Sequence, residues 1–290
     1  MDNNFVIDSE TRVYGIIGNP VRHSLSPIMH NIAFSKLGLN CIYLAFHVED
    51  IKEAIIGVKA LGIQGLSVTI PHKTTVIPHL DWVDPIAYRM NAVNTIVNEN
   101  GVLKGYNSDG IGAYLSITGN NIDLNDKNVL IIGNGGTAKS IAYTIIDRAK
   151  INRLNILGRD KERVEAFINR LKEHTNFHQI SSFYRIDDDN LVNAVQNSDI
   201  IINTSPIGMS PNDKLTPIPV KLITEKHVIF DVVYKPLKTM LLKEAEKRNA
   251  TIINGLEMLI NQGVVQFELW TKKKAPKTDM YDAIKGKIII

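Results

Sequence analysis

The sequence predicts an α/β protein with two domains and mostly parallel sheets. Three observations lead to this prediction. The chain has 290 residues, a length that domains of ordinary size divide into about two. Short apolar segments alternate with segments of helical periodicity along most of the chain, as in strand–helix–strand units. A glycine-rich turn joins an apolar strand to a helix near the middle of the chain, over residues 129–146.

The composition indicates a soluble globular protein. Hydrophobic residues make up 44% of the chain and charged residues 22%, with a net charge of +3. We expect no nucleic-acid binding, which needs a concentrated basic face, whereas a mild positive charge suits small anionic ligands. The single cysteine, Cys41, excludes an internal disulfide and fits a reducing compartment. Neither a secretory signal nor a membrane-spanning apolar run is visible, so we expect a cytoplasmic protein without membrane partners.

The first elements alternate between strand and helix. They are expected at residues 13–17, 26–37, 42–48, 51–61 and 66–70. Ser26 followed by Pro27 is typical of a helix start with the hydroxyl as N-cap. The hydroxyls of Ser24 and Ser26 at this helix N-terminus could hold a carboxylate, although spacing alone favours a plain helix cap for Ser26.

Three polar residues lie at or near the ends of later strands. Lys73 follows the strand 66–70, at the strand end where open α/β sheets bind ligands, and a solvated lysine would give the same pattern. Asn94 lies within an apolar strand over residues 92–97, and Asp109 begins the next helix. From spacing alone, a structural amide and an N-cap aspartate are the simpler interpretations.

The central stretch 129–146 has the sequence VLIIGNGGTAKSIAYTII. Four apolar residues predict a strand, and apolar residues spaced by three and four predict the helix that follows. Gly133, Gly135 and Gly136 would let the backbone approach a phosphate, which the N–H groups of the helix N-terminus could bind. A tight turn without any ligand is the alternative, because a lone glycine cluster is a weak signal.

Strands and helices continue to alternate after this turn. Strands are expected at residues 154–157, 183–186, 200–203, 228–231 and 251–253, and helices at 161–171, 191–194 and 237–248. Together with the strand before the glycine turn they make six strands, as in a Rossmann-type parallel sheet.

The residues after the second of these strands indicate the cofactor. The sequence there is GRDKER, and Arg159, Lys161 and Arg163 favour NADP, since cations suit its 2′-phosphate. Asp160 would repel that phosphate if it pointed inward, so NAD stays possible.

The last long helix begins near NGLEMLINQG and has an apolar stripe. Its members are Leu256, Leu259, Ile260, Gly263, Val264 and Phe267. Gln262 lies off this stripe, so periodicity alone places it in solvent.

Five motifs, in this order and at these separations, resemble the shikimate dehydrogenase family. They are GNPVRHSLSP, SVTIPHK, AVNTIV, NSDG and GNGGTA. The resemblance extends from Tyr14 to about Ile284. It implies a substrate-binding catalytic domain over residues 1–109, completed by the C-terminal helices of 255–290. It also implies a Rossmann NADP-binding domain over 110–254, with a cleft between the two domains.

The resemblance also implies roles for individual residues. Lys73 and Asp109 are then catalytic; Ser24, Ser26 and Tyr234 bind the substrate carboxylate; and Thr69, Asn94 and Gln262 bind its hydroxyls. The cofactor-binding residues are Gly133, Asn134, Gly135, Gly136, Thr137, Arg159, Lys161, Arg163, Met209, Val232 and Gly255.

The implied reaction is the reversible NADPH-dependent reduction of 3-dehydroshikimate to shikimate, a step of aromatic amino acid biosynthesis. A proton donor must stand within hydrogen-bond reach of the ketone oxygen, and either Lys73 or Asp109 could carry the proton. Five positions depart from the family pattern. Ser67 stands where bacterial members often have asparagine, and Gly158 and Asp160 replace residues of a typical Asn-Arg-Thr. Ser108 stands in place of the usual threonine and Gly263 in place of the usual alanine.

Two alternatives remain open at this point. A quinate/shikimate dehydrogenase using NAD would tolerate the departures at Ser67 and Asp160. A non-catalytic sensor could bind a dinucleotide and a hydroxy acid on the same fold, but it would not need both Lys73 and Asp109. The eight histidines show no paired metal-binding spacing, so we expect no metal. The substrate is the expected partner, and we expect a monomer or a homodimer.

Overall fold

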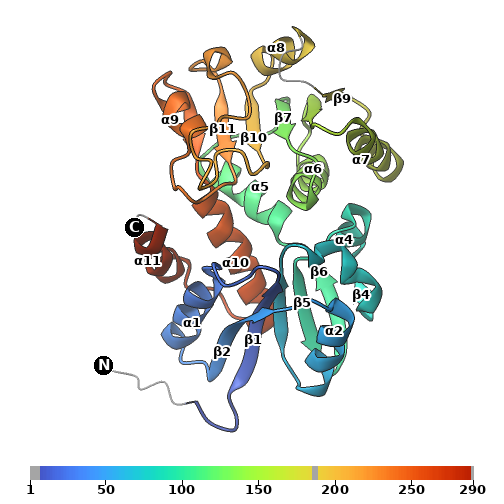
Figure 1. Ribbon diagram of the computed structural model, residues 1–290, viewed down its shortest axis with the longest axis vertical. Coiled ribbons are helices and arrows are strands. Elements are labelled where there is room, and N and C mark those ends of the chain that lie inside the picture. Colours follow the sequence, from blue (N-terminus) through green and yellow to red (C-terminus); the bar gives the residue numbers. More distant parts are fainter. Residues whose placement is uncertain (1–6, 185–188, 289–290) are drawn as a thin grey trace. The chain divides into compact units, whose positions relative to one another are not determined.

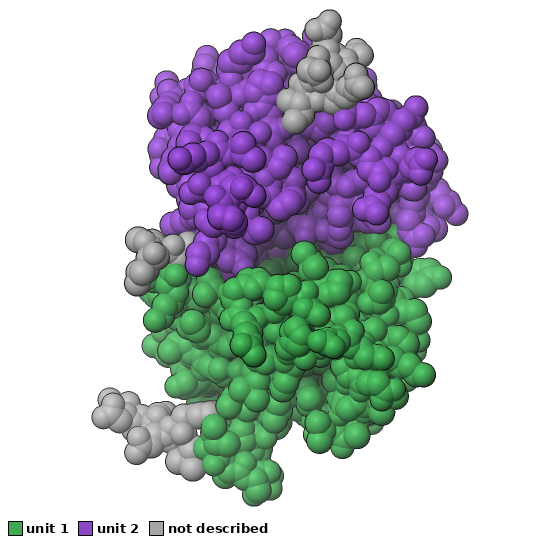
Figure 2. Space-filling model, in the orientation of Figure 1, with its two compact units in different colours: residues 1–109, 260–288, 290 green, residues 110–259, 289 purple. Residues whose placement is uncertain are grey.

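The computed structural model of this chain describes residues 7–184 and 189–288. Its contacts divide the chain into two compact units (Figures 1 and 2). The first unit consists of Met1–Asp109 with Ile260–Ile288, and the second of Gly110–Leu259.

The first unit contains a mixed six-stranded sheet in the order β2-β1-β3-β5-β6-β4. The strands are β1 (Arg12–Gly18), β2 (Cys41–His47), β3 (Gly65–Val68), β4 (Trp82–Val83), β5 (Thr95–Glu99) and β6 (Val102–Tyr106). β1 pairs in parallel with β2 and β3, whereas β5 is antiparallel to both β3 and β6. Ser67 pairs with Thr95 at the end of the β3–β5 ladder. Thr69 and Asn94 therefore lie just outside the strands in which we expected them.

The helices of the first unit cover both faces of this sheet. They are α1 (Ser26–Lys36), α2 (Ile51–Ala60), α3 (His72–Thr75), α4 (Pro85–Met90), the part of α10 (Gly255–Thr271) that follows Leu259, and α11 (Lys277–Ile288), with a 3-10 turn at Ile77–His79. On one face, Ile55 and Val58 of α2 pack into an apolar cluster with Leu66 and Ile96.

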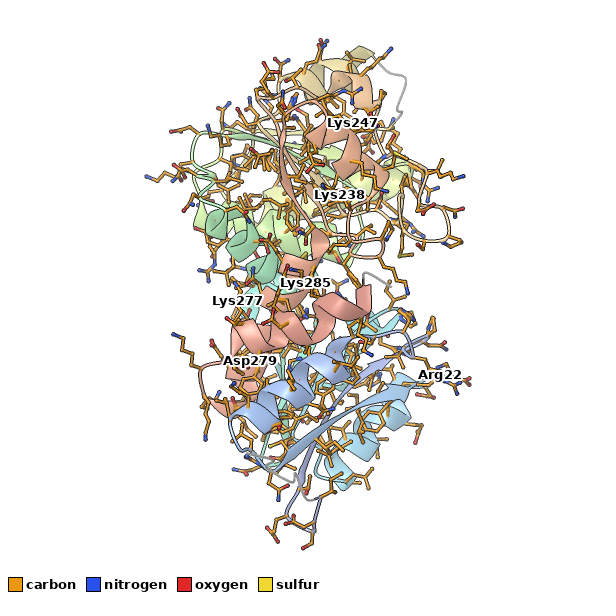
Figure 3. All side chains as sticks on the ribbon, turned by 90° about the vertical axis from the view of Figure 1, so that its left-hand side faces the viewer. Arg22, Lys238, Lys247, Lys277, Asp279 and Lys285 are labelled. Atoms are coloured by element: carbon orange, nitrogen blue, oxygen red, sulfur yellow. The ribbon has the colours of Figure 1, made fainter. Side chains whose placement is uncertain are left out.

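An aromatic cluster packs in the first unit between strand and helix residues. The rings of Tyr14 and Tyr43 lie 5.6 and 5.8 Å from that of Trp270 on α10. The indole N–H of Trp270 donates to the carbonyl of Ile96 at 2.9 Å, and Gly65 leaves room for its ring. This packing holds α10 against the sheet. Asp279 of α11, labelled in Figure 3, pairs with Lys36 of α1 at 2.9 Å.

The second unit contains a wholly parallel sheet in the order β12-β11-β10-β7-β8-β9. Its strands are β7 (Asn128–Ile132), β8 (Arg153–Leu157), β9 (Ile180–Phe183), β10 (Ile200–Asn203), β11 (Val228–Asp231) and β12 (Thr251–Ile253). Numbered within the unit this is the order 3-2-1-4-5-6, so the predicted Rossmann-type sheet is confirmed.

The helices of the second unit are α5 (Asp109–Gly119), α6 (Gly136–Arg148), α7 (Lys161–His174), α8 (Asp189–Gln196) and α9 (Met240–Glu246), with a 3-10 turn at Val220–Leu222. α5 begins at the last residue of the first unit, and α10 begins in the second unit at Gly255. Among the described residues, none of the helices is both long and apolar enough to cross a membrane.

The clearest differences from the predicted element boundaries in this unit concern β9 and α9. β9 ends at Phe183, which pairs with Leu157, where we expected a strand over residues 183–186; residues 185–186 lie outside the described chain. α9 begins at Met240 rather than at residue 237, because the Thr239 hydroxyl accepts the N–H of Leu242 and caps the helix there.

Candidate active site

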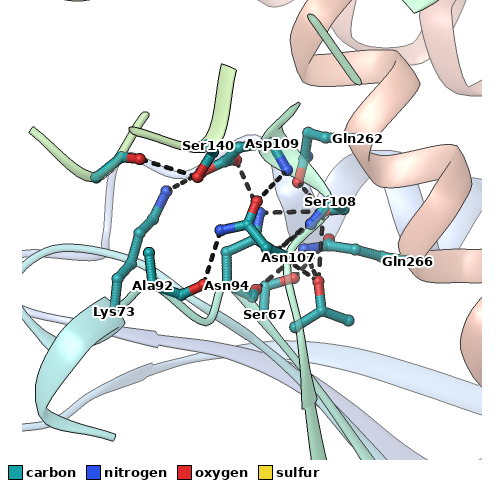
Figure 4. Close-up of polar contacts among 12 residues, drawn as sticks. Ser67, Lys73, Ala92, Asn94, Asn107, Ser108, Asp109, Ser140, Gln262 and Gln266 are labelled. Carbon is teal, nitrogen blue, oxygen red and sulfur yellow. Dashed lines mark hydrogen bonds and ion pairs between the residues drawn. The ribbon is translucent and has the colours of Figure 1, made fainter. Parts of the chain in front are cut away.

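Lys73 and Asp109 form an ion pair in the first unit. Lys73 belongs to α3, shortly after β3, and Asp109 is the first residue of α5, shortly after β6. The Lys73 Nζ lies 2.5 Å from Asp109 Oδ2, and the two side chains are 19% and 9% exposed (Figure 4). A charged pair that is partly withdrawn from water is a common feature of proton-transfer sites.

Asn94 holds the other oxygen of the Asp109 carboxylate. Its Nδ2 donates to Asp109 Oδ1 at 2.7 Å, and its Oδ1 accepts the backbone N–H of Ser108 at 2.7 Å. Asn94 is 2% exposed. Since an ammonium and a carboxamide NH₂ can only donate, both oxygens of Asp109 act as acceptors in this arrangement.

Gln262 is buried beside this group, although periodicity predicted it in solvent. It is 8% exposed, and its Oε1 accepts a weak hydrogen bond from the Ser108 hydroxyl at 3.4 Å. The prediction was wrong because α10 is enclosed on several faces: Asn261 and Gln266 on the same helix are also buried. A polar residue on such an enclosed helix forms hydrogen bonds with buried groups instead of facing solvent.

Gln266 and Tyr43 join the same polar group and were missed by the sequence analysis. The Tyr43 hydroxyl donates to Ser67 Oγ at 2.6 Å, and Ser67 Oγ donates to Gln266 Oε1 at 2.7 Å. Burial raises the pKa of the Tyr43 phenol, which keeps it protonated. The spacing of four between Gln262 and Gln266 was the available signal, because residues four apart share a helix face.

Ser24 and Ser26 are arranged differently from the predicted cap. α1 is preceded by Leu25, whose side chain makes no cap, and the Ser24 hydroxyl accepts the N–H of Ser26 at 3.2 Å. Ser26 is buried. The interpretation of Ser26 as a plain N-cap is therefore wrong. Thr69 is half-buried after β3, where Gly18 leaves room for its methyl group.

The glycine turn of the second unit leaves the start of α6 open. Gly135 occupies the N-cap position without a side-chain cap, and a Cβ added to it would meet no atom within 4 Å. Gly133 has a φ of +115°, and a Cβ there would collide with the Thr204 hydroxyl. The uncapped N–H groups of α6 are thus available to a phosphate. Asn134 lies between Gly133 and Gly135, and Thr137 follows Gly136 in the first turn of α6.

The packing after β8 accounts for two departures from the family pattern, Gly158 and Asp160. A Cβ on Gly158 would collide with Val164 and lie 3.4 Å from the Asn134 carboxamide, so no larger side chain fits without repacking. The Nδ2 of Asn134 is buried and has no hydrogen-bond partner among the described residues. Asp160 caps α7 by accepting the N–H of Arg163 at 3.1 Å.

Asp160 also neutralises part of the basic cluster that we expected around a 2′-phosphate. Its carboxylate lies 3.2 Å from the Arg163 Nε, and Lys161 lies 3.9 Å from Glu165. Arg159 is exposed and forms no ion pair with any described residue. Arg159 is therefore the cation of this cluster that is best suited to an incoming anion.

Asp231 and Asn203 hold the loops after β11 and β10. Asp231 is fully buried and accepts hydrogen bonds from Asn203 Nδ2 at 2.9 Å, Thr239 Oγ1 at 2.6 Å and the Val233 N–H at 3.1 Å. Burial nevertheless raises its pKa to about 6. These contacts position the backbone that carries Val232.

The other predicted residues of this region are Met209, Tyr234 and Gly255. A Cβ on Gly255 would collide with the Val232 carbonyl, so these two backbones touch. Met209 is 47% exposed, and burial raises the pKa of the Tyr234 phenol. Within the described ranges, no three His, Cys, Asp or Glu side chains gather as metal ligands.

The structure therefore brings the predicted residues together in two groups, one in each unit. In the first unit, hydrogen bonds link Lys73, Asp109, Asn94 and, through Ser108, Gln262. In the second unit, the glycine turn opens α6, and Gly255 touches Val232.

Comparison with known proteins gives consistent matches along the chain. The sequence matches three family models: "Shikimate dehydrogenase substrate binding domain" over residues 16–96, "Shikimate / quinate 5-dehydrogenase" over 116–223 and "Shikimate 5'-dehydrogenase C-terminal domain" over 255–285. A shikimate dehydrogenase (NADP(+)) of Methanosphaera stadtmanae is 46% identical over 272 residues, which cover 92% of this chain and 94% of that protein.

Two crystal structures are also similar over nearly the whole chain. A shikimate dehydrogenase in complex with NADP⁺ has a TM-score of 0.90 at 42% identity and covers 98% of both chains. The shikimate 5-dehydrogenase from Listeria monocytogenes, in complex with shikimate and NAD, has a TM-score of 0.91 at 34% identity, covering 96% of this chain and 98% of the other.

Proposed function

Because the chain belongs to the shikimate dehydrogenase family, we propose that it interconverts 3-dehydroshikimate and shikimate with Lys73 and Asp109 as the catalytic pair. The chain is an NADP-dependent oxidoreductase. The observation that carries the proposed roles is the 2.5 Å contact between Lys73 and Asp109, with Asn94 on the second carboxylate oxygen.

The reaction needs a proton at the substrate oxygen. NADPH, when bound, supplies the hydride, and negative charge develops on the ketone oxygen as the bond forms. Lys73 donates a proton to this oxygen during reduction and takes it back during oxidation. Asp109 holds the ammonium in place, because both of its oxygens already accept hydrogen bonds from groups that only donate. General acid–base help of this kind is worth about 10²–10⁴ in rate.

The substrate hydroxyls and carboxylate need polar partners in the first unit. Asn94 and Gln262, both buried beside Asp109, suit the hydroxyls, together with Thr69 after β3. Ser24 and Ser26 at the start of α1 suit the carboxylate. Tyr234 belongs to the second unit, and its part in carboxylate binding stays a prediction.

The second unit offers the features that a dinucleotide requires. The uncapped N-terminus of α6 suits the pyrophosphate. The turn that leads to it, and that would face the phosphates, consists of Gly133, Asn134, Gly135, Gly136 and Thr137. Arg159 suits the 2′-phosphate, with smaller contributions from Lys161 and Arg163, whose charges are paired. Met209, Val232 and Gly255 are assigned to the nicotinamide by resemblance to the family. A cytoplasmic location and a monomeric or dimeric state stay predictions.

A kinetic grid tests the proposal. The purified protein is mixed with shikimate or quinate and with NADP⁺ or NAD⁺, and the reduced nicotinamide is followed by absorbance. We expect shikimate with NADP⁺ to give the highest kcat/KM. Equal or better use of quinate with NAD⁺ would favour the quinate/shikimate alternative. Absence of reduced nicotinamide in all four mixtures, with binding retained, would favour the sensor.

A further inference from the structure

A continuous series of hydrogen bonds runs through the interior of the first unit and ends at the catalytic pair. It begins at the Tyr43 phenol, which bonds to Ser67, and Ser67 bonds to Gln266. The Gln266 Nε2 lies 3.0 Å from Thr95 Oγ1, and Thr95 Oγ1 lies 2.8 Å from Asn94 Oδ1. Asn94 then reaches Asp109 at 2.7 Å, and Asp109 reaches Lys73 (Figure 4).

Two backbone groups determine, for every hydrogen bond in this series, which side chain donates and which accepts. The carbonyl of Asn94 can only accept, and it lies 3.2 Å from the Gln266 Nε2. The Gln266 carboxamide must therefore turn its oxygen to Ser67, so Ser67 donates to Gln266 and Tyr43 donates to Ser67.

The second backbone group acts at the other end. The N–H of Ser108 can only donate, and it lies 2.7 Å from Asn94 Oδ1. The Asn94 carboxamide thus turns its NH₂ toward Asp109. The Thr95 hydroxyl, facing the carboxamide oxygen, must donate to Asn94 and accept from Gln266.

Because its side chains are buried, breaking any hydrogen bond of this series costs free energy. Tyr43 and Thr95 are 0% exposed, Gln266 is 1% exposed and Ser67 is 5% exposed. A buried hydroxyl or amide that loses its partner leaves an unsatisfied group, and hydrogen bonds in series polarise one another. A donor on the oxygen of the Asn94 carboxamide makes its NH₂ a better donor to Asp109.

We propose that Thr95 and Gln266 are positioning residues for the Lys73–Asp109 pair, acting through the carboxamide of Asn94. This inference rests on the proposed function. Neither side chain is a hydrogen-bond partner of Lys73 or Asp109 in the described chain. Both bond to Asn94 and hold it so that Asp109 receives a donor and stays an acceptor for Lys73. Ser67 and Tyr43 extend the series and support the orientation of Gln266.

The central test is the isosteric variant Thr95→Val. We expect kcat for shikimate oxidation to fall about tenfold, as for the loss of one link in a buried network that ends on a charge, with the KM for NADP⁺ unchanged. Thr95→Ser keeps the hydroxyl and should restore most of the activity. Thr271→Val is the matched control, because among the described residues this hydroxyl bonds to backbone groups near the end of α10, the carbonyls of Phe267 and Lys273 and the N–H of Lys273, and it should match the wild type.

A double-mutant cycle separates positioning from general weakening. If Thr95 acts through Asn94, Thr95→Val should cost little further kcat in an Asn94→Ala background. An equal loss in both backgrounds, or a wild-type kcat for Thr95→Val, would overturn the proposal. If Thr95→Val unfolds in a thermal melt, Gln266→Met is tested in the same cycle with the same expected outcomes. Failure of the wild-type protein to oxidise shikimate would instead refute the proposed function.

Discussion

The buried carboxyl of Asp231 makes the stability of the second unit depend on pH. Three donors surround it, from Asn203, Val233 and Thr239, and each favours the charged form. Burial disfavours the charged form and outweighs them, so the pKa rises from 3.8 to about 6.

The sign and size of the effect follow from this shift. Because the pKa is higher in the folded chain than in the unfolded chain, folding favours the protonated form. The resulting contribution to stability is present below about pH 4 and is lost as the pH rises through about 6. A rise from 3.8 to about 6 corresponds to about 3 kcal/mol, at about 1.36 kcal/mol for each pKa unit.

Comparison with Asp231→Asn isolates this contribution, because all other titrating groups are common to both proteins. Denaturant unfolding is followed by circular dichroism at about pH 4 and about pH 7, and the free energies of unfolding are subtracted. We expect the wild type to lose about 2.4 kcal/mol relative to the variant between the two pH values, because the unfolded carboxyl is already partly ionised at about pH 4.

A second variant checks the cause. Thr239→Val removes one donor that favours the charged form of Asp231, so it should raise the pKa of this carboxyl further. The free energy of unfolding should then fall more with rising pH than in the wild type. In the Asp231→Asn background, Thr239→Val should leave the pH dependence unchanged. A difference between wild type and Asp231→Asn that stays constant with pH, or that grows in favour of the wild type as pH rises, would refute the reasoning.

Three further predictions concern the site. Lys73→Ala should lower kcat by about 10²–10⁴ with little change in KM; steady-state kinetics that show a KM effect alone would reassign Lys73 to binding. Arg159→Ala should lower kcat/KM for NADP⁺ about tenfold and leave NAD⁺ unaffected, whereas Arg163→Ala should act less because Asp160 already pairs with it; equal effects on the two cofactors would contradict a 2′-phosphate contact. Gly133→Ala should destabilise the fold by about 1–3 kcal/mol, since its φ is +115° and a Cβ would strike Thr204; an unchanged thermal melt would exclude this strain.

The local pattern of apolar and polar residues was sufficient to predict most strands and helices of the second unit. The strands at residues 200–203, 228–231 and 251–253 were predicted with the bounds that the structure has, because buried parallel strands are short apolar runs with clear ends. The start of α6 followed from its glycines. The strand order confirms the fold that this alternation predicted.

The local pattern was insufficient to predict which contact a side chain makes when it has two possible partners. Asp160 could have faced a cofactor phosphate or its own helix, and the structure shows that it caps α7 and pairs with Arg163. Ser26 has the spacing of an N-cap, yet it is buried and Ser24 accepts its N–H. Neither outcome depends on residue type or spacing alone.

Local sequence patterns predicted the order of strands and helices in the second unit, the position of the glycine turn and the residue types that resemble the family's motifs. These are local properties, set by periodicity and by which side chains suit a turn or a helix end. The burial of Gln262 and Gln266, and the position of Thr95 between Gln266 and Asn94, are visible only in the folded chain. Local pattern could not predict them, because the direction and burial of these polar groups depend on donors and acceptors more than 150 residues away in the chain.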